Sequence, residues 1–423
     1  MRFLPLFFKK VIQCGVVEIH EPNGNVTSIG GIQPGPKVTI RLTDTAIERK
    51  VLLSPEMAIA EAHMDGSLIV ENGEIYDLLA LILLNADGVK FSRSRLLLRG
   101  ADRQIERLRQ NHSILKSRQN VARHYDLGNS FYRKWLDGDM QYSCGYFANP
   151  DVSLDDAQTA KKRHIAAKMS IKPGQRILDI GCGWGGMAIY LGMLEDVEVL
   201  GVTLSTEQLS AARARAEALN ISHRIKFELM DYRHLTGKFD NIVSVGMLEH
   251  VGLPQLQTYF NKVYELLADD GVALIHSISN RSYHSSTGPF LRKYIFPGAY
   301  APTISEIAKP VEKSGLWMTD LEIQRVHYAE TLRRWRSNFV AVRAEIALEY
   351  DETFVRMWEF YLAATEAAFR HGKAHVAQAQ LAHDRAAVPL TRSYIETQED
   401  IFEAREAGFI GRITDATNTV FST

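Results

Sequence analysis

The sequence predicts an α/β fold with a parallel sheet, preceded by a small α+β unit. Three observations support this prediction. From residue 160 onward β-rich runs alternate with helical stretches, a glycine-rich turn follows the first of these runs, and short strand-like segments separated by glycine and proline fill the first 88 residues. Strands that alternate with helices pair in parallel, because each helix crosses a face of the sheet before the next strand begins.

Composition limits the classes of function. The 423 residues are enough for two domains, and a net charge of -1 does not favour a nucleic-acid partner. The three cysteines, Cys14, Cys144 and Cys182, lack CxxC spacing, so we expect a reducing cytoplasm and no metal. No window contains the roughly 18 apolar residues that a spanning helix needs. Any contact with a membrane is therefore expected to be peripheral, at its inner face.

Residues 1–88 are predicted to form the small N-terminal unit. Turn residues at Asn23-Gly24, Gly30-Gly31 and 34–36 separate β-branched runs such as Lys37–Leu42, which predicts strands and turns. The stretch 75–85 (IYDLLALILLN) is apolar and is predicted to be a buried helix. We expect this unit to face lipid.

Residues 89–123 are predicted to form a basic linker helix. From residue 90 the segment contains ten Lys or Arg residues and two acids, and Arg95, Arg99, Arg103 and Arg107 recur every four positions on one helix face. A solvated linker explains this pattern, and so does an arm that binds anionic lipid headgroups. Both interpretations remain open.

Residues 124–400 are predicted to form the main domain, in which residues 330–385 are mostly helical and cap or extend the sheet. Helices are predicted at Thr206–Leu219 and Gln255–Leu267. The predicted strands are Arg176–Ile180, Val197–Leu204, Ile225–Met230, Asn241–Val245 and Val272–Ile278.

A glycine-rich turn follows the first predicted strand of this domain, in the run RILDIGCGWGG at 176–186. Glycines allow a tight turn and a close approach of the backbone to a ligand. The form LDIGCGxG resembles motif I of the Rossmann-like S-adenosylmethionine-dependent methyltransferases. Asp179, at the end of the strand, suits the positive charges of that cofactor. The alternative is a glycine-rich turn that holds no ligand. The predicted cofactor contacts in this run are Asp179, Gly181, Gly183, Trp184 and Gly185.

The next two strands end in polar side chains. The second ends in GVTLS, where Thr203, Ser205 and Gln208 can bond ribose hydroxyls without a charge. After the third strand, Asp231 can accept from an adenine amine and Tyr232 can pack on the base. Each residue alone could equally serve an ordinary turn, but ligands of open α/β sheets bind at successive carboxyl ends of strands. We therefore include Leu204 with these contacts.

Seven motifs between residues 124 and 298 together resemble the cyclopropane fatty acid synthase family, which includes the mycolic acid methyltransferases, and the similarity in order and spacing runs through about residues 45–375. The segment HMDG at 63–66 is similar to part of that family's N-terminal domain. The seven motifs are HYDLGN (124–129), MQYSCGYF (140–147), LDIGCGWGG (178–186), GVTLSTEQ (201–208), GMLEHVG (246–252), LIHSIS (274–279) and RKYIFPG (292–298).

The resemblance implies a reaction. A methyl group passes from S-adenosylmethionine to a cis double bond in a phospholipid acyl chain, and the resulting cation loses a proton and closes to a cyclopropane ring. A bicarbonate ion serves as the bound base in this family. Tyr142 and Ser143 correspond to residues near the cofactor carboxylate. The implied bicarbonate ligands are Cys144 and Ile278, through their backbones, and Glu249, His276 and Tyr328.

Other interpretations remain. His276 alone is more often a satisfied core residue than a ligand, and only the motif around it favours a catalytic role. Thr365 stands where many members of the family carry cysteine, so no thiol nucleophile is available there. The same cation could instead leave a methyl-branched or methylene chain. A small-amine N-methyltransferase and a non-catalytic lipid carrier are further alternatives. The expected partner is the phospholipid surface, and a homodimer is compatible with the sequence.

Overall fold

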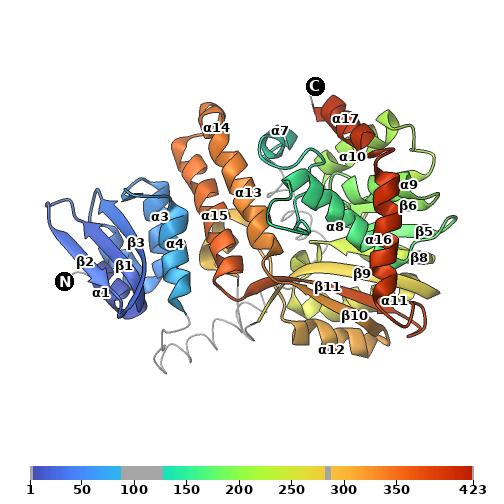
Figure 1. Ribbon diagram of the computed structural model, residues 1–423, viewed down its shortest axis with the longest axis horizontal. Coiled ribbons are helices and arrows are strands. Elements are labelled where there is room, and N and C mark those ends of the chain that lie inside the picture. Colours follow the sequence, from blue (N-terminus) through green and yellow to red (C-terminus); the bar gives the residue numbers. More distant parts are fainter. Residues whose placement is uncertain (1–2, 87–126, 282–286, 422–423) are drawn as a thin grey trace. The chain divides into compact units, whose positions relative to one another are not determined.

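The computed structural model describes residues 3–86, 127–281 and 287–421, which form two compact units (Figure 1). Among these residues, the first unit comprises 3–86, 287–297 and 329–374, and the second comprises the rest. This division differs from the predicted boundaries at 88, 124 and 400, because a helix of the 329–374 segment packs on helices of the N-terminal segment. The predicted linker 89–123 lies outside the described residues.

The first unit contains a four-stranded sheet in the order β2-β1-β3-β4, which confirms the strands and turns predicted there. β1 pairs antiparallel with β2 and parallel with β3, and β3 pairs antiparallel with β4. The predicted turn at Asn23-Gly24 joins β1 to β2, and Gly24 has a φ of 85° that suits glycine. The strands are β1 (Cys14–His20), β2 (Val26–Gly30), β3 (Gln33–Leu42) and β4 (Leu68–Val70).

Helices from distant parts of the sequence complete the first unit. The predicted helix 75–85 is α4, and it packs with α3 against α15. Thr365 lies in α15, where its hydroxyl donates to the carbonyl of Tyr361 at 2.7 Å. The helices are α1 (Phe3–Val11), α2 (Ile47–Leu53), α3 (Pro55–Met64), α4 (Ile75–Leu84), the π-helical η5 (Leu291–Ile295), α13 (His327–Ala341, whose first two residues belong to the second unit), α14 (Arg343–Glu349) and α15 (Glu352–Arg370).

The second unit contains a seven-stranded sheet in the order β10-β11-β9-β8-β5-β6-β7. The neighbouring pairs among β5 to β9 are all parallel, which confirms the predicted α/β class and each of the five predicted strands. β10 and β11 pair antiparallel at one edge. The strands are β5 (Arg176–Ile180), β6 (Glu198–Thr203), β7 (Ile225–Leu229), β8 (Phe239–Val245), β9 (Leu267–Asn280), β10 (Trp317–Gln324) and β11 (Ala374–Ala382).

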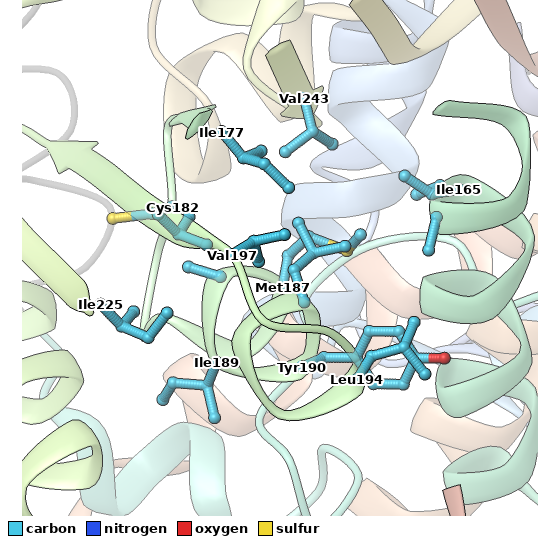
Figure 2. Packing of buried hydrophobic residues seen from close by; sticks show 14 of the residues in the cluster. Ile165, Ile177, Cys182, Met187, Ile189, Tyr190, Leu194, Val197, Ile225 and Val243 are labelled. Atoms are coloured by element: carbon cyan, nitrogen blue, oxygen red, sulfur yellow. The ribbon is translucent and has the colours of Figure 1, made fainter. Parts of the chain in front are cut away.

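Helices cover both faces of this sheet, as Figure 1 shows. Neighbouring residues of one strand enter opposite cores: Ile177 packs with α8, α9, α10, α16 and α17, whereas Leu178 packs with α11 and α12. Figure 2 shows Ile177 and Val243 gathered with side chains of α9 in the first core. The helices are α7 (Asn129–Arg133), α8 (Leu154–Met169), α9 (Gly186–Leu194), α10 (Thr206–Ala218), α11 (Leu256–Leu266), α12 (Ile304–Ser314), α16 (Ser393–Glu406) and α17 (Ile410–Phe421), with short 3-10 turns η2 (Tyr232–His234), η3 (Leu248–His250) and η4 (Leu253–Gln255).

The prediction that residues 330–385 are mostly helical and cap or extend the sheet is confirmed, since α13, α14 and α15 cover most of them. Within this range 374–382 form the strand β11, which extends the sheet and was not predicted as a strand. Its sequence, AHVAQAQLA, is rich in alanine, which favours helix, and seven of its nine residues are buried, so the strand shows little alternation of apolar and polar residues. None of the described helices is both long and apolar enough to cross a bilayer.

Candidate active site

The predicted glycine-rich turn joins β5 to α9, and glycine is needed at its positions for different physical reasons. Gly181, Gly183 and Gly185 all have positive φ angles, of 83°, 55° and 81°. A Cβ on Gly185 would lie 2.7 Å from the Phe227 ring, so this glycine permits close packing of the helix on the sheet. A Cβ on Gly183 would have only the Gln208 amide within 4 Å, so this glycine leaves space beside the turn.

A pocket lies at the carboxyl ends of β5, β6, β7 and β8, where an open α/β sheet binds its ligand. Of the thirteen predicted cofactor contacts, eleven line it. The exceptions are Gly185, which faces the core, and Ser205, whose hydroxyl caps α10 by accepting from the Gln208 amide at 3.2 Å. The predicted residues in the lining are Tyr142, Ser143, Asp179, Gly181, Gly183, Trp184, Thr203, Leu204, Gln208, Asp231 and Tyr232.

Asp179 is the buried acid of this pocket, with 2% of its surface exposed. Its Oδ2 atom has no hydrogen-bond partner among the described residues. Burial raises the pKa of Asp179 to about 7, although the Lys161 charge and the Ala188 amide lower it in part. A buried carboxylate oxygen that lacks a partner fits a ligand that carries an ammonium group.

The ends of β6 and β7 provide polar groups that suit a nucleoside. Thr203 donates to the Gln208 amide oxygen at 3.2 Å. Asp231 accepts from Arg233 through the side-chain Nε at 2.8 Å and Nη2 at 2.7 Å. Burial raises the pKa of Asp231, but the hydrogen bonds and charge of Arg233 outweigh it, so the net pKa is lowered. Asp231 therefore stays ionised beside Tyr232, which packs edge-on against Tyr259.

Aromatic rings support the side of the pocket formed by Tyr142 and Trp184. Tyr132 contacts both rings, with centroid distances of 5.4 Å to each. Trp135 packs edge-on against Tyr142, and the indole N–H of Trp184 donates to Asn129 at 2.7 Å. These contacts support both side chains at the wall of the pocket.

The predicted anion ligand Glu249 lies in the turn η3. Its neighbour in sequence, His250, lines the pocket. The Oε1 atom of Glu249 accepts from the Ile278 amide at 2.5 Å, so the structure brings these two predicted residues together. Oε2 has no partner among the described residues. Burial raises the pKa of Glu249 to about 7, more than the Ile278 amide lowers it. This carboxyl can therefore gain or lose a proton near neutral pH.

His276 precedes Ile278 by two residues in β9 and is 2% exposed. Its Nδ1 accepts from the Gln378 amide nitrogen at 3.1 Å. Burial lowers the pKa of His276 to about 3, and the charges of Lys161 and Lys168 add to this effect. The ring is therefore neutral, and with Nδ1 as acceptor its proton resides on Nε2, which can donate to an anion.

Cys144 and Tyr328 are also buried, at 1% and 7% exposure. The Cys144 thiol lies 3.8 Å from the Gln324 amide oxygen. The Phe147 amide donates to His327 at 3.0 Å, which places the chain after Cys144 beside the residue before Tyr328. The structure thus provides contacts that link the Cys144 and Tyr328 segments, and separate contacts that link Glu249 and Ile278.

Sequence reasoning missed several residues of this site. Gln378 and Gln324 come from β11 and β10, which the sequence did not predict as strands, and Arg233 is an ordinary surface type. Lys161 hydrogen-bonds to Ser143 from helix α8, and its position in the sequence carries no motif that points to this contact. These residues act through contacts distant in sequence.

The sheet and its pocket define a Rossmann-like S-adenosylmethionine-dependent methyltransferase. Comparisons with known proteins agree. Residues 112–379 match the family model described as mycolic acid cyclopropane synthetase, and the chain belongs to this family.

Relatives extend the similarity beyond the matched residues. The cyclopropane-fatty-acyl-phospholipid synthase of Escherichia coli K12 is 37% identical over 78% of this chain and 84% of its own length. A probable fatty acid methyltransferase of Pseudomonas putida is 34% identical over 83% of this chain and 87% of its own. The crystal structure of mycolic acid cyclopropane synthase CmaA1 complexed with SAH and CTAB is 30% identical, with a TM-score of 0.58, and covers 62% of this chain and 97% of that one.

Proposed function

We propose that this enzyme transfers a methylene group from S-adenosylmethionine to the cis double bond of an unsaturated phospholipid acyl chain and forms a cyclopropane ring. One observation carries the proposal: Glu249, a buried carboxyl with a pKa near 7, is bonded to a β9 amide beside the cofactor pocket. Methyl transfer alone needs no such group. Ring closure requires a weak base near the methyl carbon, and a base of this kind needs a site that holds it.

The residues present fit a bound bicarbonate ion. A protonated Glu249 and the Nε2–H of His276 can both donate to its oxygens, and Tyr328 adds a hydroxyl. An ionised Glu249 can instead accept a hydrogen bond from the hydroxyl group of the bicarbonate ion. When bound, bicarbonate would supply the base that removes the methyl proton. The chain's part is to hold that ion and to keep its charge near the cationic transition state.

The same residues keep the site dry. Cys144, Glu249, His276 and Tyr328 are each less than a tenth exposed. Low exposure strengthens the attraction between a bound anion and a developing cation, because water no longer screens it. It also protects that cation from attack by water.

The substrate class follows from the Escherichia coli relative, whose name specifies a fatty-acyl phospholipid. We propose that the enzyme acts from the cytoplasm at the inner face of the membrane, with the N-terminal unit toward the lipid. The exposed side chains of Leu52 and Leu53, beside Arg49 and Lys50 on α2, suit an anionic lipid surface.

Mass spectrometry of the lipid product tests the proposal. The purified enzyme is incubated with S-adenosylmethionine and liposomes of a monounsaturated phospholipid, and the acyl chains are then released. A gain of one CH2, roughly 14 mass units, in a chain that resists mild hydrogenation supports ring formation. The same gain in a chain that hydrogenates favours methyl branching, which the similarity to a fatty acid methyltransferase keeps as the second candidate. No gain would overturn both.

A further inference from the structure

Helix α8 buries polar side chains that the reaction does not explain. Gln158, Lys161 and Lys162 are each at most 1% exposed. A buried ammonium group is costly unless hydrogen bonds and opposite charges compensate it. Its partners therefore indicate what such a group does.

Lys161 reaches the wall of the cofactor pocket. Its ammonium group donates to the Ser143 hydroxyl oxygen at 2.9 Å and to the Gln141 amide oxygen at 2.5 Å. Gln141 in turn donates to Asp139 at 3.0 Å. Because an ammonium group only donates, the Ser143 hydroxyl oxygen accepts from Lys161, and the hydroxyl proton is directed away from Lys161, where it can be donated to a ligand in the pocket. Ser143 and Gln141 both line the pocket.

Neighbouring residues on the same helix hold the backbone of this segment. The Gln158 amide nitrogen donates to the Ser143 carbonyl at 2.9 Å, and the Ala157 carbonyl accepts from the Tyr146 amide at 2.8 Å. Ala157, Gln158 and Lys161 occupy positions i, i+1 and i+4, so one side of the helix fixes the segment 143–146. Helix α8 thus holds Ser143 at two points, the backbone carbonyl and the hydroxyl oxygen.

The charges around the pocket are arranged as a pair. Asp179 presents a carboxylate oxygen without a partner among the described residues, whereas Lys161 places a positive charge behind Ser143. The field of Lys161 lowers the pKa of Asp179 and of His276, so it acts across this region. A ligand with an ammonium group and a carboxylate, as in an α-amino acid, complements both groups.

We propose that Lys161 is a positioning residue for the carboxylate of the cofactor's methionine moiety, because it orients the Ser143 hydroxyl toward that carboxylate and adds an attractive positive charge. The proposal rests on S-adenosylmethionine as the cofactor, but not on the identity of the lipid product. It assigns to Lys161 a role in cofactor selection without direct contact.

Two ligands that differ only in the amino-acid moiety test it: S-adenosylhomocysteine carries this group, and 5'-methylthioadenosine lacks it. Dissociation constants are measured by calorimetry. Lys161→Met should weaken the affinity for S-adenosylhomocysteine by about 10-fold or more, the range for a lost charge-assisted contact. It should weaken the affinity for 5'-methylthioadenosine by less than about 2-fold. Lys162 is the matched control, since like Lys161 it is buried in the same helix and lies outside the pocket lining, but its ammonium group pairs with Asp139 at 2.5 Å instead of with Ser143. Lys162→Met should change the two affinities by the same factor.

A second variant keeps the test independent of folding. Ser143→Ala leaves the buried charge in place and should reproduce the selective loss of S-adenosylhomocysteine. The double variant should lose less affinity for S-adenosylhomocysteine than the sum of the two single losses, because both changes break one hydrogen-bonded chain and only the charge of Lys161 acts independently of Ser143. Equal weakening of both ligands by Lys161→Met, or an unchanged ratio in Ser143→Ala, would overturn the proposal. Because these measurements contain no lipid, a failure of ring formation would leave them intact, and a failure here would leave the proposed reaction intact.

Discussion

Replacement of Glu249 by glutamine separates the charge of this side chain from its shape. Glutamine keeps an oxygen that can accept from the Ile278 amide, now 2.5 Å from Oε1, but it cannot ionise. A hydrogen bond to a charged group contributes about 1.5–3 kcal/mol, and each 1.36 kcal/mol in the barrier is tenfold in rate. Turnover should therefore fall about 10-fold to 160-fold. Affinity for S-adenosylhomocysteine should change by less than about 2-fold, because Glu249 does not line the cofactor pocket.

The assay measures transfer of labelled methyl into liposomes, together with the dissociation constant of S-adenosylhomocysteine. Glu406 provides the matched control: it is 6% exposed, burial raises its pKa, and it lies in α16 outside the pocket lining. Glu406→Gln should lower the unfolding temperature if it has any effect, and leave turnover per folded molecule unchanged. Loss of cofactor affinity in Glu249→Gln as large as the loss of turnover would refute its assignment to the anion site.

Three further predictions concern the cofactor and the base. The pKa of Asp179 is about 7 and an ammonium group prefers the ionised form, so S-adenosylhomocysteine should bind about 10-fold more tightly at pH 8 than at pH 6, as titrated by calorimetry. Asp179→Asn should flatten this profile. It should also stabilise the ligand-free protein above pH 7, because a carboxyl whose pKa is raised by folding makes the protein less stable as pH rises toward that pKa. Gly183→Ala should weaken the cofactor, whereas Gly237→Ala, with equally open space and a φ of 93°, should cost only stability in a thermal melt. Removal of bicarbonate from the buffer should lower the turnover of the wild-type enzyme, and its return should restore it; Glu249→Gln should respond less.

Local patterns in the sequence predicted much of the fold. Each of the five parallel strands was predicted within a few residues, because buried strands between helices form short apolar runs. The turn after β5 was predicted because positive φ angles at Gly181, Gly183 and Gly185 require glycine. Asp179, Asp231 and Tyr232 were predicted to contact the cofactor because they lie at the carboxyl ends of strands. Two predicted contacts, Gly185 and Ser205, instead serve packing and capping, since a motif does not show which way each residue faces.

Only the tertiary structure decided which distant residues meet. By itself the sequence determined the α/β class, the cofactor turn and the family, since these depend on short runs whose spacing is set by backbone geometry. It did not reveal that β11 lies in the sheet and brings Gln378 to His276, or that Lys161 on α8 supports Ser143. Such contacts depend on strand order and helix packing, which bring together residues as distant in the chain as His276 and Gln378, 102 positions apart, or Cys144 and Gln324, 180 positions apart. The raised pKa values of Glu249 and Asp179 also depend on the tertiary structure, because burial is a property of the folded chain.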